Sequence, residues 1–366
     1  MFFPNSENTL LAIGDKGINT LSDLNSSPGF KFGCISYDLK NKIERLQSIQ
    51  NKNLHWNDIG FFKADFVKQG NTTTGNLNDF LTENTVQFSQ NKLNIQCRVS
   101  KQKYIETVEK LKQHIQFGDI YEINYCIEFF ADNAEINPFV VFEKLNTISE
   151  APFAVMAKFG DKYVLCSSPE RYIKKQNQKL ISQPIKGTRK RSSNETEDNR
   201  LKNELKNDAK EQRENVMIVD LVRNDLSKIA LKNSVNVDEL FGVYSFKQVH
   251  QLISTVSCEL DSKTTLEEII KASFPMGSMT GAPKVRAMQL IDEYEELNRG
   301  LYSGSIGFID ENNNFDFNVV IRTIIYDTKT KYLSFSVGSA ITAYCDAEKE
   351  WEECMLKANA MFKALE

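Results

Sequence analysis

The segment Tyr121–Phe130, with the sequence YEINYCIEFF, indicates the fold class of this chain. Apolar and polar side chains alternate along it, which is typical of a β-strand with one apolar face and one polar face. The apolar set is Ile123, Tyr125, Ile127 and Phe129, and the other set is Glu122, Asn124, Cys126 and Glu128. The segment therefore predicts a strand whose two faces have different environments.

Helices and further strands are expected on both sides of this segment. Ser100 can cap a helix that ends near Gly118, and Asn137-Pro138 opens another. Strict alternation of strands and helices is missing, so the sequence predicts an α+β fold with large antiparallel sheets. Later helices are expected over 196–226, 283–297 and 347–364, and strands near 151–159, 162–167, 302–310, 315–326 and 331–337.

The composition is that of a soluble globular protein. Hydrophobic residues make up 41% of the 366 residues and charged residues 26%. The net charge of −4 does not indicate binding to nucleic acid or to an anionic membrane. No signal peptide or run of about 20 apolar residues is recognised. The seven cysteines form no Cys-x-x-Cys pair, which predicts a reduced, cytoplasmic protein.

Lys186 lies between Pro184 and Gly187, in a stretch that cannot be a regular helix. A lysine on a structured turn can be a nucleophile if burial or neighbouring cations lower its pKa. It can equally be a solvated loop residue at the edge of the basic run 189–191. The residues alone leave both interpretations open.

Two later helices carry glutamates that could bind a cation. Glu214 begins an apolar helix face, where a carboxylate needs an ion pair or a bound metal. In the terminal helix, Glu353 lies four residues before Lys357, which is also the spacing of an ordinary ion pair on a solvated face. Two glutamates from separate helices could hold Mg²⁺, which keeps positions open for substrate oxygens.

Three further segments could bind an anion. The glycine-containing loop 274–284 runs into a helix, where backbone N–H groups favour an anion, although it could be a plain connector. Residues 338–341 are expected to form a second loop of this kind after a strand. Arg322, expected within the strand 315–326, either pairs with a carboxylate or lies on a wet strand face.

Five blocks of this sequence occur in an order that points to a known family. They are Ser167–Glu170, Pro184–Arg189, Glu214–Leu221, Gly277–Lys284 and Tyr302–Gly307. Together they resemble the signature motifs of the chorismate-utilising enzymes, which include anthranilate synthases, aminodeoxychorismate synthases, and isochorismate and salicylate synthases. The resemblance runs from about residue 100 to the C-terminus, and residues 1–95 match only loosely.

The resemblance implies the chorismate-binding fold of anthranilate synthase component I. In that fold two large, mostly antiparallel sheets form a sandwich flanked by helices, and the active site lies between the two halves. Residues 1–95 are expected to form the N-terminal part of the same fold, and residues 96–366 the chorismate-binding catalytic region.

The family's site residues carry over to matching positions of this sequence. Glu214 and Glu353 match the positions that hold Mg²⁺ against the ring carboxylate of chorismate. The other matches are substrate positions, including those that hold the enolpyruvyl carboxylate. These are Thr280, Tyr302, Arg322, Gly338 and Lys357.

Within the family, the residue at Lys186 separates members by product. Anthranilate and isochorismate synthases typically carry Ala there, whereas aminodeoxychorismate synthases carry Lys. The implied mechanism is covalent: Lys186 attacks C2 of chorismate as the C4 hydroxyl leaves, with Glu170 as general acid and base. Ammonia then attacks C4 and expels the lysine, giving 4-amino-4-deoxychorismate for 4-aminobenzoate and folate synthesis.

The ammonia is expected from a separate glutamine amidotransferase subunit, because no Gly-x-Cys-x-Gly glutaminase motif is present. Two alternatives are an anthranilate synthase component I and a non-catalytic, chorismate-binding regulatory subunit. Three residues depart from the family pattern. Glu122 replaces the usual Gln of amine-using members, Gln251 a frequent His, and Ser339 a common Gly.

Overall fold

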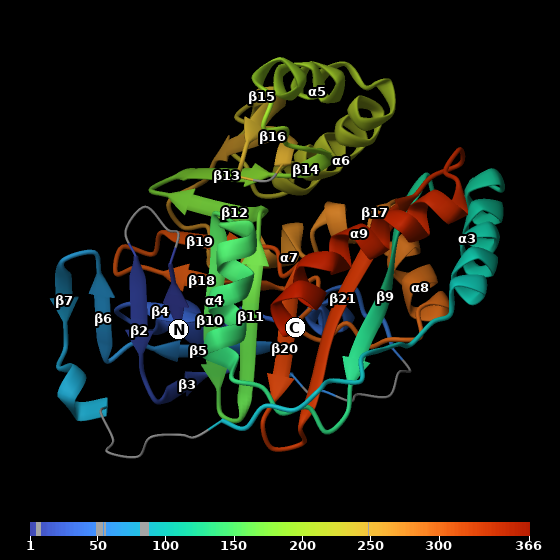
Figure 1. Cartoon of the computed structure of the whole chain (residues 1–366). Helices are drawn as coiled ribbons and strands as arrows, with labels where there is room; N and C mark the ends of the chain where they lie inside the picture. The colour runs from blue at the N-terminus through green and yellow to red at the C-terminus, as the bar shows by residue number, and fades with distance from the viewer. Residues whose placement is uncertain (5–8, 49–53, 55, 81–87, 248) are drawn as a thin grey trace.

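Two large antiparallel sheets pack face to face, and helices cover their outer surfaces (Figure 1). The computed structural model describes residues 1–4, 9–48, 54, 56–80, 88–247 and 249–366. A buried apolar cluster between the sheets joins residues such as Val164 and Ile325 of one to Phe32 and Ile306 of the other. The arrangement confirms the predicted α+β sandwich.

The first sheet has eleven strands within the described residues. Its strands follow the order β17 (Gly281–Ala282), β9 (Glu122–Ala131), β21 (Tyr332–Ile341), β20 (Thr323–Asp327), β11 (Lys162–Ser168), β10 (Phe153–Phe159), β1 (Phe2–Phe3), β2 (Leu10–Ile13), β6 (Phe66–Gln69) and β7 (Thr72–Thr74), with β8 (Gln96–Cys97) paired to β9. Strands β1, β2, β6 and β7, from the N-terminal 95 residues, therefore belong to the same sheet as the strands from the rest of the chain.

The second sheet has ten strands within the same residues. Their order is β14 (Ile185–Lys190), β16 (Val249–Glu259), β13 (Lys179–Gln183), β12 (Arg171–Gln176), β19 (Phe315–Asn318), β18 (Ser305–Ile309), β4 (Lys31–Ile35), β5 (Ile59–Lys63) and β3 (Lys16–Ile18), with β15 (Asn236–Ser245) paired to β16. Figure 1 shows β14, β15 and β16 at the top of the molecule.

Helices pack on the outer face of each sheet. In the first sheet, α3, α4 and α9 bury their apolar sides against β9, β20 and β21, and in the second, α6 and α7 cover β13 and β16. Among the described residues, no helix combines the length and apolar character needed to cross a bilayer. The helices are α1 (Leu21–Ser26), α2 (Lys40–Ile43), α3 (Lys101–Gln116), α4 (Pro138–Ser149), α5 (Glu195–Asn207), α6 (Ala209–Ser227), α7 (Leu266–Ser273), α8 (Lys284–Tyr294) and α9 (Ala347–Leu365), with short 3₁₀ turns η1 (Tyr37–Leu39), η2 (Leu77–Phe80) and η3 (Gly277–Met279).

Strand β9 carries the alternation read from the sequence. Its apolar residues, such as Ile123 and Tyr125, belong to the core beneath the outer helices. The other face carries Glu122, Asn124 and Glu128, all less than 10% exposed. The predicted strand is confirmed, and its polar face is buried inside the molecule, where it can line a site.

One predicted helix is two helices. The helix expected over 196–226 is interrupted at Asp208, which ends α5 and caps α6 with a backbone outside the helical region. The Asp208 carboxylate accepts hydrogen bonds from the N–H groups of Lys210 and Glu211. Because this side chain replaces the missing helical acceptors, a new helix starts there.

Two strand boundaries were also predicted wrongly. The strand expected over 315–326 is two strands, because the chain crosses from β19 in the second sheet to β20 in the first. Arg322 lies in this crossing with φ of 51°, not in a strand. Residues 338–341, expected as a loop, continue β21 and pair with β9. Apolar residues fill the crossing because both sheets bury it, so hydrophobicity alone could not reveal the break.

A buried ion pair ties the inner face of β9 to the chain between α8 and β18. The Arg299 guanidinium donates to both oxygens of Glu295, at 2.8 and 2.5 Å, and to the carbonyl oxygens of Asn124 and Met279. Both charged side chains are only 1% exposed. The pair therefore fixes the backbone near the polar face of β9.

Replacing Arg299 with Met is expected to lower the free energy of unfolding by about 3–5 kcal/mol, because it leaves Glu295 buried without its cation. Urea denaturation followed by circular dichroism measures the change. As a control, Arg200→Met removes an arginine that is 54% exposed and pairs with Glu197 and Glu204 on α5. That variant is expected to lose less than about 1 kcal/mol. If both variants lose the same free energy of unfolding, the buried Arg299–Glu295 pair contributes no more to stability than the exposed Arg200 pairs.

Candidate active site

Lys186 is the second residue of β14, at an irregularity in the pairing with β16. The register shifts between Ile185 and Thr188, and Gly187 has φ of 82°. A Cβ on Gly187 would lie 3.0 Å from atoms of Glu211 and Leu205, so glycine suits this position in both conformation and space. At this register shift, the Lys186 side chain points toward Glu122 of β9 and is only 11% exposed.

Glu122, on the polar face of β9, holds the amine of Lys186. Lys186 Nζ donates to Glu122 Oε1 at 2.6 Å, and the Glu122 side chain is 1% exposed. The backbone of Glu122 is fixed in turn by pairing with Ala282 of β17. The loop 274–284 thus forms a 3₁₀ turn and a short strand that support the wall of the site.

Carboxylates determine the protonation of Lys186. Burial alone would lower its pKa, but the negative charges of Glu122, Glu214 and Glu353 outweigh burial and raise the pKa above its ordinary value. Lys186 is therefore an ammonium at neutral pH in this structure. The sequence suggested the opposite route to a nucleophile, in which burial or cations lower the pKa.

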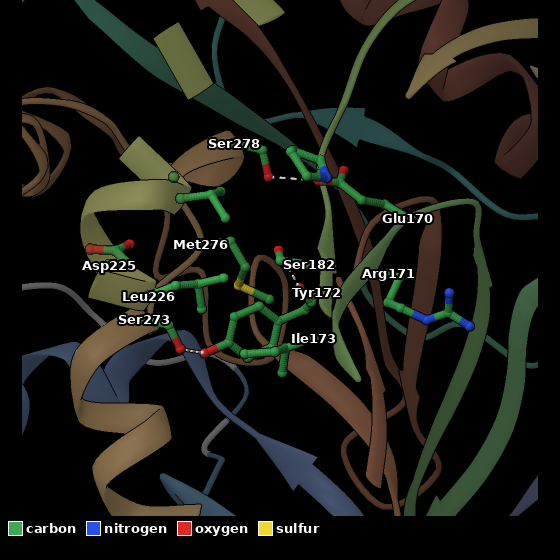
Figure 2. Close-up of a pocket in the computed structure, with 13 residues that line it drawn as sticks. Glu170, Arg171, Tyr172, Ile173, Ser182, Asp225, Leu226, Ser273, Met276 and Ser278 are labelled. Carbon is green, nitrogen blue, oxygen red and sulfur yellow. Dashed lines mark hydrogen bonds between the residues drawn. The ribbon is translucent and has the colours of Figure 1, made fainter. Parts of the chain in front are cut away.

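Glu170 lies in the connection between β11 and β12 and is 5% exposed. Ser278 Oγ donates to Glu170 Oε1 at 2.8 Å, and Figure 2 shows this pair at one end of a small pocket, with Tyr172 and Ser273 paired at the other end. Burial raises the pKa of Glu170 to about 7, although Ser278 and the charge of Lys186 act to lower it. A carboxyl group with this pKa can give and take a proton near neutral pH.

Glu214 faces the same region from α6. Its side chain is 12% exposed, and Oε1 is buried without a hydrogen bond, with Lys210 Nζ at 3.7 Å. Burial raises the pKa of Glu214 to about 7, an effect that the charge of Lys186 reduces. Lys210 also pairs with Glu350 of α9 at 3.5 Å. Helices α6 and α9 therefore meet through charged groups.

Glu353 and Lys357 form the ion pair that their spacing on α9 predicted. Lys357 Nζ lies 2.7 Å from Glu353 Oε1 and donates to the carbonyl oxygen of Gly338 at 2.8 Å. Burial acts to raise the pKa of Glu353, but Lys357 and the other cations lower it overall. A Cβ on Gly338 would lie 2.5 Å from Cys126 Sγ, so only glycine fits where β21 faces this part of β9.

Two of the remaining substrate candidates, Tyr302 and Thr280, are buried against β9. Tyr302 is 5% exposed, and its hydroxyl accepts a hydrogen bond from Cys126 Sγ at 3.8 Å. Thr280 is fully buried and donates from Oγ1 to the Met276 carbonyl oxygen. Burial lowers the pKa of Arg322, and the charge of Glu170 partly offsets this. Arg322 therefore shares its environment with Glu170.

The carboxylates of the site could bind a hard cation such as Mg²⁺ only if substrate or water supplied further oxygen ligands. Within the described part of the chain, no group of three or more His, Cys, Asp or Glu side chains is arranged to hold a metal ion. Mg²⁺, however, is commonly bound by one or two carboxylates together with substrate oxygens and water. Glu214 Oε1, which accepts no hydrogen bond and lies 3.7 Å from Lys210 Nζ, is an oxygen of the required kind.

The sequence did not reveal several residues of the site. Ser278 and Lys210 were not singled out, and Glu122 was noted as a member of the polar face of 121–130 and as a departure from the family pattern. Glu350 lies on the same helix as Glu353 and Lys357 and is only 3% exposed, because α9 packs against β21. The alternation of 121–130 did place Glu122 on the polar face of a strand, but no local signal showed that this face is buried or that Glu122 pairs with Lys186.

Residues 15–363 match the family described as chorismate binding enzyme, and the chain belongs to this family. It is 39% identical over 285 residues to a probable chloroplastic aminodeoxychorismate synthase of Oryza sativa subsp. japonica, covering 77% of this chain and 32% of that protein. It is 33% identical over 355 residues to aminodeoxychorismate synthase component 1 of Escherichia coli (strain K12), covering 92% of this chain and 77% of that protein.

The fold is also found in solved structures. Anthranilate synthase component I from Streptococcus pneumoniae TIGR4 superposes with a TM-score of 0.84 and 24% identity, over 97% of this chain and 92% of that one. This likeness establishes the fold alone. Several curated relatives are longer proteins, and the chain spans between 32% and 56% of the length of four of them.

Proposed function

We propose that this chain aminates chorismate at C4, giving 4-amino-4-deoxychorismate through a covalent bond to Lys186. One observation carries the proposal: a buried lysine amine lies close enough to Glu170 for its charge to act on that carboxyl group, which can exchange a proton near neutral pH. The names of the rice and E. coli relatives support the 4-amino product.

Lys186 and Glu170 divide the chemistry between them. The neutral amine of Lys186 attacks C2 of chorismate while the ring double bonds shift and the C4–O bond breaks. Glu170 in its protonated form gives its proton to the departing hydroxyl, which leaves as water. Ammonia then attacks C4 and loses a proton to the Glu170 carboxylate, and the lysine leaves from C2.

Positively charged groups and a metal would hold the dianionic substrate. We assign Glu214 and Glu353 to a Mg²⁺ ion, which supplies positive charge for the ring carboxylate when bound. The enolpyruvyl carboxylate is assigned to Arg322 and Tyr302, with the backbone near Gly338. Thr280 and Lys357 complete the substrate pocket in this proposal.

The ammonia is proposed to come from a separate glutamine amidotransferase subunit. The E. coli relative carries "component 1" in its name, which supports a partner for proteins of this kind. The reaction is placed in the cytoplasm, in keeping with seven cysteines that are all free thiols. Neither nucleic acid nor a membrane has a role in the proposal.

A coupled assay tests the proposed product. Purified chain is incubated with chorismate, Mg²⁺ and ammonium, with and without an aminodeoxychorismate lyase. The expected result is 4-aminobenzoate only when the lyase is present. Strong anthranilate fluorescence without the lyase would assign the chain to the anthranilate-forming members, and binding of chorismate without any product would indicate a regulatory subunit.

Glu214→Gln is expected to raise the Mg²⁺ concentration needed for half-maximal activity by about tenfold or more, because one of two charged ligands is lost. Calorimetric titration of Mg²⁺ in the presence of chorismate checks the affinity directly. Since the pKa of Glu214 is raised to about 7, protons compete with the metal, and the wild-type affinity is expected to fall as the pH drops below 7.

Asp220→Asn provides the control for this prediction. Asp220 lies on the same helix, is 60% exposed and pairs with Arg223. Its replacement removes a negative charge from α6 without touching the site, so the Mg²⁺ affinity is expected to stay within about twofold. A Glu214→Gln protein that binds Mg²⁺ as tightly as the control would remove Glu214 from the metal site.

A further inference from the structure

The contact between Glu122 and Lys186 has no role in the steps described above. It is a 2.6 Å ion pair in which the carboxylate is almost wholly buried and the lysine is 11% exposed. Glu122 Oε2 is buried and forms no hydrogen bond with any described residue. The ammonium of Lys186 is therefore the group that compensates this buried charge, and the carboxylate in turn binds the proposed nucleophile.

Three other carboxylates face Lys186 from other elements. Glu214 of α6 and Glu353 of α9 act on it through their charges, and Glu170 of the β11–β12 connection feels the charge of Lys186 in return. Glu122 differs from these three because it is the hydrogen-bonded partner of the lysine and has the largest of the carboxylate effects on it. A change at Glu122 should therefore act on Lys186 more strongly than a change at the others.

We propose that Glu122 is a positioning residue that restrains Lys186, holding its amine protonated and hydrogen bonded until this ion pair opens. The inference rests on the proposed function, in which Lys186 is the nucleophile. It assigns to Glu122 a task that an uncharged amide in its place could not perform to the same degree, because only a carboxylate favours the ammonium by charge.

The restraint has a clear chemical consequence. An ammonium has no lone pair, so Lys186 must lose a proton to solvent before its nitrogen can bond to C2. A negative charge in direct contact opposes that loss, whereas a neutral amide accepts the same hydrogen bond with little opposition. The amine should therefore be less reactive with Glu at position 122 than with Gln.

Competitive acetylation of Lys186 measures this directly. The purified chain is treated with a trace of acetic anhydride across a pH series, and peptide mass spectrometry reports the acetylation of Lys186 separately from other lysines. In Glu122→Gln, the midpoint of Lys186 labelling is expected to fall by about one to three pH units. The labelling rate at neutral pH should rise by about tenfold or more, and the covalent adduct with chorismate should form faster.

Two variants guard against indirect effects. Glu122→Asp keeps the negative charge and should label close to the wild-type midpoint. Glu128→Gln removes another buried carboxylate from the same face of β9, about 20 Å along the strand, where it pairs with Arg98. Its Lys186 labelling should be unchanged. The thermal unfolding temperature of each variant shows whether it is folded under the labelling conditions.

Two outcomes would overturn the proposal. Labelling of Lys186 that is the same in Glu122→Gln and wild type would show that the ion pair does not restrain the amine. Faster labelling combined with a loss of adduct formation would make Glu122 the base that the reaction needs instead of a restraint. Acetylation does not depend on the product, so a shifted midpoint in a chain that makes no 4-amino compound would refute only the proposed function.

Discussion

Lys186→Ala is expected to lower the rate of 4-amino-4-deoxychorismate formation by about 1000-fold or more, because the amine that forms the intermediate is gone. Chorismate binding should change only a few-fold, since the proposed carboxylate-binding groups remain. Intact-protein mass spectrometry in the absence of ammonia gives the second measurement. The wild-type chain should gain the mass of chorismate minus one water, and Lys186→Ala should gain nothing.

Lys186→Arg separates the charge of the side chain from its nucleophilicity. The guanidinium stays protonated and can still pair with Glu122, but it does not attack carbon under these conditions. It should be as inactive as the alanine variant and form no adduct. An arginine or alanine variant that still makes the product at the wild-type rate would remove Lys186 from the reaction, and the site would then have to be interpreted as non-covalent.

Glu170→Gln is expected to have the second largest effect, a fall in kcat of about 10²–10⁴-fold. The amide keeps the size of the side chain and can still accept the hydrogen bond from Ser278, but it cannot give a proton to the leaving hydroxyl. Stopped-flow measurement of adduct formation without ammonia isolates this step. It should slow by about the same factor as the overall reaction.

The buried carboxylate of Glu128 provides a matched control, because Glu128→Gln makes the same chemical change away from Ser278 and Glu170. This variant should keep kcat within about threefold of the wild type. If Glu170→Gln forms the adduct at the wild-type rate but turns over slowly, Glu170 acts only in the later attack by ammonia, and its assignment as the acid for the C4 hydroxyl is wrong.

The sequence predicted those parts of the fold whose signals are local. Alternation along Tyr121–Phe130 predicted β9, and Ser100 and Asn137 predicted the starts of α3 and α4. It failed where a long-range environment decides the structure. Val319 and Val320 suit a strand in composition, yet they are buried in a crossing between two sheets that no local pattern reports.

The candidate site divides in the same way. Glu353 and Lys357 are four residues apart on one helix, so their ion pair could be predicted from spacing. Glu122 and Lys186 are 64 residues apart and meet only because β9, the second strand of one sheet, and β14, the edge strand of the other, approach each other in the folded chain. Their contact, and the raised pKa of Lys186 that follows from it, could not be predicted from the sequence.

The central claim is that amination occurs at C4, and nuclear magnetic resonance of the product tests it most directly. The chain is incubated with chorismate, Mg²⁺ and ¹⁵N-labelled ammonium, without a lyase. The account predicts a product with ¹⁵N bonded to C4 and the enolpyruvyl group retained. A product with ¹⁵N bonded to C2, whether or not it has become anthranilate, would contradict the account.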